Sequence, residues 1–189
     1  MISYLTGQPL FDVDGTLVLD VRGVGYSIQL TDATLAWALT QENISLWIDT
    51  LVRENSFDLY GFETKNELYF FKKLIEVSGI GPKSALGIIG LASTDTLYQA
   101  IVNNNIGFLT SVPGIGKKTA ERMCIELRDK LKDYAGETER PIHEGDNDVV
   151  DALVALGYSP AQAYQAIEKI DPKVTEVNER VKAALGNIA

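Results

Sequence analysis

The sequence predicts an α+β multidomain protein, and three observations carry this prediction. Glycine-punctuated, β-branched segments fill the first sixty residues, which is typical of short strands. From Lys65 onward apolar residues recur at helical spacing, and a Gly-Ile-Gly segment occurs twice, thirty-five residues apart. A polar, acidic stretch then precedes a last helical segment. With 189 residues and 46% hydrophobic composition, the chain can bury one medium core or two to three small ones.

The N-terminal residues 1–63 are predicted to form a small β-barrel. Apolar and β-branched runs at residues 16–21, 25–30, 44–53 and 57–62 indicate strands, with glycines and polar turns between them. About five short strands in a segment of this length favour a barrel. Apolar alternation shows only that one face of each strand is buried, so the strand order stays open.

Residues 64–135 are predicted to form a helical domain. Apolar side chains recur at helical spacing from Leu68 to Ile75, and similar patterns continue to about Tyr134 between glycine-rich breaks. Cys124, the only cysteine, falls on the apolar face of the last of these helices. We therefore expect it to be a core residue, and a single cysteine excludes an intrachain disulfide.

The internal repeat lies within this helical domain. Residues 78–85 read SGIGPKSA, and residues 113–120 read PGIGKKTA. Two glycines around one apolar residue allow a turn too tight for larger side chains, while Ile80 or Ile115 can point inward as an anchor. A helix is predicted to start directly after each turn. Its unpaired N–H groups and its dipole favour an anion such as phosphate.

Lysines occupy the first turn of both of these helices, although positive charge there opposes the helix dipole. Lys83, Lys117 and Lys118 occupy the first turns, so local helix stability does not explain them and a phosphate ligand does. Net charge is −9, but residues 64–134 hold 10 basic and 7 acidic side chains. Residues 1–63 hold 2 basic and 9 acidic, and residues 135–189 hold 5 and 10. Phosphate contacts are therefore expected in the middle third.

The repeat resembles the helix-hairpin-helix motif, which in tandem binds double-stranded DNA through its backbone. The alternative is that Gly-Ile-Gly merely joins two packed helices. Little base specificity is expected, because the contacts are to phosphates. The DNA contacts that the resemblance implies are Gly79, Gly81, Lys83, Gly114, Gly116, Lys117, Lys118, Thr119 and Arg122.

The C-terminal part is predicted to be an acidic linker followed by a helical bundle. Residues 136–146 are polar and acidic and contain proline and glycine, so they form the linker. Residues 147–189 hold three short helices. In the first, one apolar face is expected to carry a set of five residues that ends near Gly157. These are Val149, Val150, Leu153, Val154 and Leu156.

The whole chain resembles the RuvA family. The resemblance rests on residues 23–26 (GVGY), 59–62 (LYGF), 79–83 (GIGPK), 112–126 (VPGIGKKTAERMCIE) and 152–159 (ALVALGYS). It implies an oligonucleotide/oligosaccharide-binding (OB) barrel at the N-terminus and a homotetramer that holds four-way (Holliday) DNA junctions. Whether one or two tetramers hold a junction stays open. It further implies that the C-terminal bundle recruits the RuvB ATPase motor, with the RuvC junction resolvase as a further partner, for branch migration in recombination and DNA repair during the response to DNA damage.

Two further sites follow from the resemblance. The family places an acidic pin of two adjacent acids in the turn before the last barrel strand, whereas here only Glu54 is acidic and Asn55 follows it. Glu54 is assigned to the pin, against the alternative of a solvated turn residue. Leu156 and Tyr158, beside Gly157, are candidates for contact with the motor, against the alternative of ordinary core residues.

Catalysis is not expected of this chain. One histidine, His143, offers no nucleophile–base pair, and the phosphate-binding Gly-x-x-x-x-Gly-Lys spacing of ATPases is missing. A DNA glycosylase using Asp129 or Asp133 is the enzyme alternative, but these acids lie among basic residues as on a solvated face. No cofactor, metal or membrane span is expected, and the chain carries no recognisable signal peptide, so a cytoplasmic protein is predicted.

Overall fold

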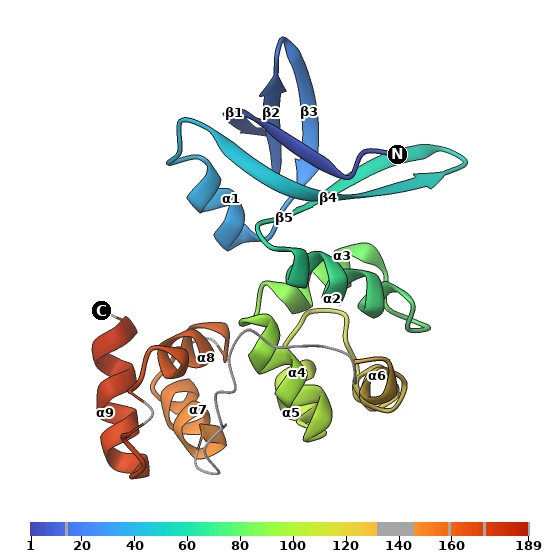
Figure 1. Ribbon diagram of the computed structural model, residues 1–189. Coiled ribbons are helices and arrows are strands. Elements are labelled where there is room, and N and C mark those ends of the chain that lie inside the picture. The colour runs from blue at the N-terminus through green and yellow to red at the C-terminus, as the bar shows by residue number, and fades with distance from the viewer. Residues whose placement is uncertain (14, 132–145, 159, 172, 189) are drawn as a thin grey trace. The chain divides into compact units, whose positions relative to one another are not determined.

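The computed structural model describes residues 1–13, 15–131, 146–158, 160–171 and 173–188, which form helices and strands as Figure 1 shows. Two compact units are present, Met1–Lys73 and Leu74–Ala189. The first is built on strands and the second on helices, so the α+β class is confirmed. Most of the predicted linker, residues 136–145, lies outside the described residues. The four-part division of the chain at residues 63, 135 and 146 stays a prediction.

The first unit contains a closed five-stranded barrel with the order β1-β2-β3-β5-β4. Neighbouring strands are antiparallel except β3 and β5, which run parallel. Four strands match the prediction to within one or two residues, and the barrel itself is confirmed. The strands are β1 (Tyr4–Val13), β2 (Thr16–Val21), β3 (Val24–Gln29), β4 (Ile44–Arg53) and β5 (Ser56–Phe62).

The sequence did not reveal β1 or the short helix α1 (Asp32–Ala38). Most of β1 is exposed or only half-buried, so its hydrophobic pattern is weak. In α1, the side chain of Thr31 accepts a hydrogen bond from the Thr34 N–H at 3.1 Å, which fixes the helix start. Ala38 of α1 is buried in the barrel core and Leu35 packs against it. The helix therefore contributes side chains to the hydrophobic core of the closed barrel.

Helix α2 (Lys65–Ile75) follows the last strand and begins with a capping box. The N–H of Thr64 donates to the Glu67 carboxylate at 3.0 Å, and the N–H of Glu67 donates to the Thr64 hydroxyl at 3.1 Å. Phe71 of α2 stacks on Tyr60 of β5, with ring centroids 5.1 Å apart. This aromatic packing explains why the barrel unit extends to Lys73.

The second unit is entirely helical in its described part. Its helices are α3 (Pro82–Ile89), α4 (Thr94–Val102), α5 (Ile106–Leu109), α6 (Lys117–Lys130), α7 (Asp146–Ala155), α8 (Pro160–Glu168) and α9 (Val177–Ile188). Helices α7, α8 and α9 are the three short helices that the sequence predicts for the C-terminal part. In the described part of the chain, no single helix is long and apolar enough to cross a bilayer. Helices α3 and α4 reach that length and composition only as a pair, bent by 104°.

A buried ion pair joins the first and last helices of the C-terminal bundle. Asp146, placed by sequence at the end of the linker, is the first residue of α7 and is buried. The Arg180 guanidinium of α9, also buried, donates to the Asp146 carboxylate and, at 2.7 Å, to the carbonyl oxygen of Val174. The carboxylate and the carbonyl thus neutralise and satisfy a cation that is removed from water.

Replacing Arg180 with Met should therefore destabilise the bundle. The change leaves the Asp146 carboxylate buried without its counter-ion, which costs about 3–5 kcal/mol in comparable sites. Amide hydrogen exchange should speed up in peptides of α7 to α9 and stay unchanged in the barrel. The double change Asp146→Asn with Arg180→Met should restore part of the protection. Unchanged exchange in the single variant would show that the pair contributes no stability.

Candidate nucleic-acid interface

The two Gly-Ile-Gly segments adopt the same backbone turn. Gly79 has φ +93° and Gly114 has φ +87°, a left-handed region that favours glycine. The next N–H closes the turn in each copy: Ile80 donates to the carbonyl of Val77 at 3.1 Å, and Ile115 donates to that of Val112 at 3.0 Å. The structure thus bears out the sequence repeat as two equivalent hairpins, centred on Gly79 and Gly114.

The isoleucine at the centre of each hairpin points into the core, as predicted. Ile80 is 5% exposed and Ile115 is 4% exposed, in contrast to the exposed glycines around them. In each Gly-Ile-Gly segment, the isoleucine packs into the core and the two glycines leave the backbone bare on the exposed side. This arrangement explains the choice of residue at all three positions. The exposed side of each hairpin is backbone, which is the part that can approach a ligand closely.

The second glycines start the helices. The N–H of Ala85 donates to the Gly81 carbonyl at 2.9 Å, and that of Ala120 donates to the Gly116 carbonyl at 3.0 Å. Gly81 is the N-cap of α3 with an extended φ of −87°, so the positive φ belongs to the first glycine of its hairpin. A Cβ built on Gly81 or Gly116 meets no atom within 4 Å. Open space therefore lies next to both helix starts.

The predicted lysines lie where the sequence places them. Lys83 is the second residue of α3, and Lys117 and Lys118 are the first two residues of α6. All three are exposed. Each hairpin therefore combines a helix N-terminus, an open glycine and at least one lysine, which together suit an anion.

Thr119 and Arg122 connect the two hairpins. A Cβ built on Gly79 would lie 3.9 Å from the hydroxyl oxygen of Thr119, in ordinary contact. The Arg122 guanidinium donates to the carbonyl oxygen of Ser78 at 3.1 Å, forty-four positions earlier in the chain. The hydrogen bond from Arg122 to Ser78 and the nearness of Thr119 to Gly79 place the two hairpins side by side. Sequence reasoning assigned both residues to DNA and missed this linking role, because nothing local signals a contact so distant in sequence.

Cys124 is a core residue, as predicted. It is 1% exposed on the inner face of α6, and burial raises the pKa of its thiol, while nearby Arg128 partly offsets that effect. A buried thiol with a raised pKa is a poor nucleophile. This residue therefore stabilises the hairpin domain by packing.

Glu54 lies at the tip of the β4–β5 hairpin of the first unit. Arg53 pairs with Ser56 across the two strands, which leaves Glu54 and Asn55 as the two turn residues, both exposed. The side chain predicted for an acidic pin is therefore accessible. Its role at a junction stays a prediction.

In the bundle, the predicted apolar face of α7 is only partly buried, so that prediction is partly wrong. Val149 and Leu153 are fully buried, but Val154 is 41% exposed and Leu156 is 61% exposed. Gly157, with φ +98°, ends the helix, and the Tyr158 N–H donates back to the Leu153 carbonyl at 3.2 Å. Leu156, just before this reversal, is exposed and Tyr158, just after it, is half-buried, so Leu156 is the more accessible of the two candidate contacts.

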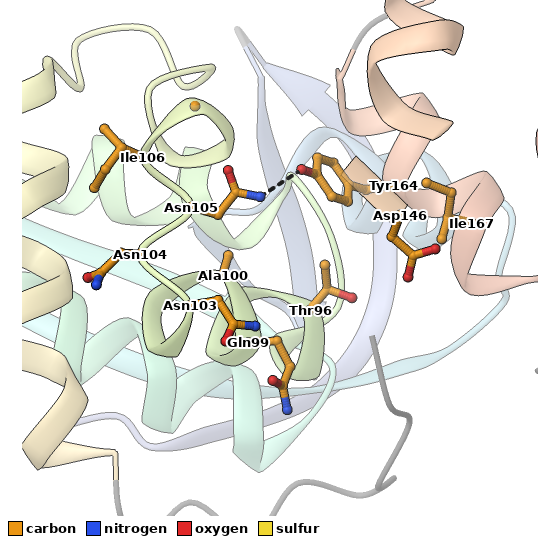
Figure 2. Close-up of a pocket in the computed structure, with 11 residues that line it drawn as sticks. Thr96, Gln99, Ala100, Asn103, Asn104, Asn105, Ile106, Asp146, Tyr164 and Ile167 are labelled. Carbon is orange, nitrogen blue, oxygen red and sulfur yellow. Dashed lines mark hydrogen bonds between the residues drawn. The ribbon is translucent and has the colours of Figure 1, made fainter. Parts of the chain in front are cut away.

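One further cavity, of about 410 Å³, lies in the second unit, lined mainly by α4, α5 and the segment between them (Figure 2). The Asn105 amide donates to the Tyr164 hydroxyl at 3.3 Å, and Phe108 contacts the Tyr164 ring edge-on. Burial raises the pKa of Tyr164. The predicted DNA contacts are not among the residues that line the cavity.

The described residues contain no group of three or more acidic, histidine or cysteine side chains that could hold a metal ion. Of the acids weighed for the enzyme alternative, Asp133 lies outside the described residues, as does His143. Asp129 is in α6, but its side chain is not described.

Comparison with known proteins gives the same three parts in the same order. Residues 1–61 match the RuvA N-terminal domain, residues 71–129 the SAM-like tandem helix-hairpin-helix domain, and residues 146–189 the RuvA C-terminal domain.

Relatives match the chain over nearly its whole length. Proteins of Neisseria meningitidis and Bordetella petrii, each named as the RuvA subunit of the Holliday junction branch migration complex, are both 41% identical to it. The first alignment covers 100% of this chain and 99% of the relative, and the second covers 98% and 97%. With the three domain models in order and this identity over the full length, the chain belongs to the RuvA family.

Proposed function

We propose that this chain binds four-way DNA junctions through their sugar–phosphate backbone, without reading base sequence. The observation that carries the proposal is the pair of equivalent hairpins, with glycines at φ +93° and +87° and exposed lysines at the helix starts that follow. The relatives are named as subunits of a Holliday junction branch migration complex, which supports the junction as the ligand.

Each hairpin can contact one phosphate through two kinds of group, uncharged backbone N–H donors and charged lysine side chains. The N–H groups at the start of α3 or α6 supply oriented donors, and Gly81 or Gly116 leaves room for the phosphate to reach them. Lys83 in one hairpin, and Lys117 and Lys118 in the other, supply positive charge. Backbone contacts of this kind position the DNA but carry no sequence information.

The side-by-side arrangement sets two phosphate contacts at a fixed separation. Thr119 lies beside Gly79, and Arg122 holds the Ser78 carbonyl. We infer that Arg122 also faces the DNA, since its guanidinium is exposed and has donors beyond the one that Ser78 uses. A rigid pair of contacts matches the regular spacing of phosphates along a duplex arm.

A homotetramer would offer one hairpin pair to each of the four arms, with Glu54 near the point where strands exchange. Its carboxylate would repel phosphates there, with half the charge of a two-acid pin. The exposed Leu156, and Tyr158 beside it, would contact the RuvB motor. That motor would hydrolyse ATP and drive branch migration, with this chain as its non-catalytic DNA-binding subunit acting in the cytoplasm, and the RuvC resolvase would act on the same complex.

A competition binding assay tests the junction preference. A synthetic four-way junction and a linear duplex with the same arm sequences are compared in excess non-specific DNA. We expect strong preference for the junction, unchanged when its sequence is scrambled, because the contacts are to phosphates. Equal affinity for both would reduce the protein to a general duplex binder. Binding to neither would make the hairpins simple helix connectors.

Lys118→Ala should weaken DNA binding to every sequence alike and make it less sensitive to salt. Losing one phosphate contact should lower the slope of log affinity against log salt concentration by about 0.9. Lys182→Ala serves as the matched control, since Lys182 is an exposed lysine of α9 outside the hairpins. Equal slopes for both variants and the unchanged protein would exclude Lys118 from the interface.

The two glycines of the second hairpin should respond differently to alanine. Gly114→Ala places a side chain at φ +87°, which costs about 1–2 kcal/mol, so the thermal unfolding midpoint should fall. Gly116→Ala meets no atom within 4 Å and should leave unfolding unchanged. It should still reduce junction affinity, because the added methyl group occupies the space that the phosphate needs. Full affinity in Gly116→Ala would place the phosphate elsewhere.

A further inference from the structure

The β4–β5 hairpin continues beyond the closed part of the barrel as a two-stranded ribbon, which Figure 1 shows extending away from the other strands. β1 pairs with β4 only up to Trp47, and β3 pairs with β5 only at Leu59 and Tyr60. In the described structure, residues 56–58 therefore pair with β4 alone. Thr50 marks the base of the ribbon, where its hydroxyl donates to the Ile2 carbonyl at 2.6 Å.

One face of this ribbon is apolar and exposed. Val52 and Phe57 are directly opposite each other across the strands, so their side chains lie on the same face. The pair that precedes them on that face, Thr50 and Leu59, is buried. Val52 is nevertheless 67% exposed and Phe57 59% exposed. The core-facing side of β4 and β5 thus continues beyond the closed part of the barrel, and the exposed ring of Phe57 lies on this extension.

The rest of the ribbon carries charge. Glu54 is at the tip, Arg53 is exposed beside it, and Asp58 lies on the opposite face, where its carboxylate accepts a hydrogen bond from the Ser56 hydroxyl at 2.9 Å. Two carboxylates against one guanidinium disfavour phosphate groups near the ribbon. Of the uncharged parts of a DNA molecule, the bases suit this face best, because their flat π-faces can stack on an aromatic ring. Bases present their flat faces only where stacking is interrupted, as it is where strands exchange.

The size of the face also fits a base better than a protein. Two side chains of this kind present on the order of 200 Å², whereas a stable protein interface buries about 800 Å² on each partner. An aromatic ring with an aliphatic neighbour matches the area of a single base or base pair. Stacking of this type is indifferent to sequence, because every base has a π-face.

We propose that Phe57, supported by Val52, stacks on a base at the crossover of the four-way junction and so marks the point of strand exchange. The inference rests on the proposed junction binding and adds to it a contact made to bases rather than to phosphates. The ribbon then acts as a wedge: its ring holds the last base of an arm, while Glu54 and Asp58 keep the phosphates away from it.

Phe57→Ala tests the proposal, with Phe11→Ala as its matched control. Phe11 is also an exposed aromatic of the barrel, at 52%, but lies on β1 outside the ribbon. We expect Phe57→Ala to lower junction affinity on the order of tenfold, with duplex affinity unchanged. Phe57→Trp should retain junction affinity, because it keeps the ring, and Phe11→Ala should behave as the unchanged protein. Equal thermal unfolding of all variants checks folding.

Photo-crosslinking supplies a readout independent of affinity. A junction carrying 5-iodouracil beside the crossover should crosslink to Phe57, as mapped by peptide mass spectrometry, and the same base eight pairs along an arm should not. Two results together would overturn the inference: full junction affinity of Phe57→Ala, and no crosslink to Phe57 in the unchanged protein. The junction proposal would still stand. A smaller oligomer in Phe57→Ala, measured by light scattering without DNA, would instead make this face a subunit contact and also overturn it. If the unchanged protein does not prefer the junction, both proposals fall.

Discussion

The left-handed glycine that opens each hairpin is the constraint on which the candidate interface depends. At φ near +90°, Gly79 and Gly114 reverse the chain within three residues, which lets the following isoleucine return to the core. The same reversal aims the start of the next helix outward. Core packing and ligand binding are thus set by one backbone conformation that other residues rarely adopt. A side chain at either position would disturb both at once.

Charge is distributed to match this arrangement. Three of the basic residues of the helical middle, Lys83, Lys117 and Lys118, lie at the starts of α3 and α6, where they are unfavourable for the helix and favourable for an anion. The barrel and the C-terminal segment are acidic. A strongly negative protein can therefore still bind DNA, because a phosphate senses the nearest charges and screening weakens those beyond about 8–10 Å in ordinary salt.

Much of this could be predicted from the sequence, for reasons that are local. The strands 16–21 and 44–53 and the exposed lysines follow from short-range patterns that backbone geometry obeys. The hairpins could be predicted because their sequence occurs twice, so a weak motif gained support from its own repetition. Strand β1 and helix α1 were missed, since β1 is largely exposed and α1 is fixed by a capping threonine and by packing against strands distant in sequence. The hydrogen bond between Arg122 and Ser78 and the ion pair between Arg180 and Asp146 could not be predicted either, since each joins residues distant in sequence. Leu156 was placed on the apolar face because the helical spacing was extended to it, whereas α7 ends one residue earlier, at Ala155.

The two hairpins share a backbone but differ at the first residue of the helix that follows. In the first copy this residue is Pro82, which has no N–H to offer and whose ring holds φ in the helical range. In the second it is Lys117, which keeps its N–H and adds a charge. The first hairpin therefore has a restricted backbone and one lysine, Lys83, whereas the second has two lysines and should depend more on ionic strength. In the proposed DNA complex, rising salt concentration would weaken the phosphate contact of the second hairpin more than that of the first. Two phosphate contacts of unequal salt sensitivity would let a DNA arm turn about the first hairpin without leaving the complex.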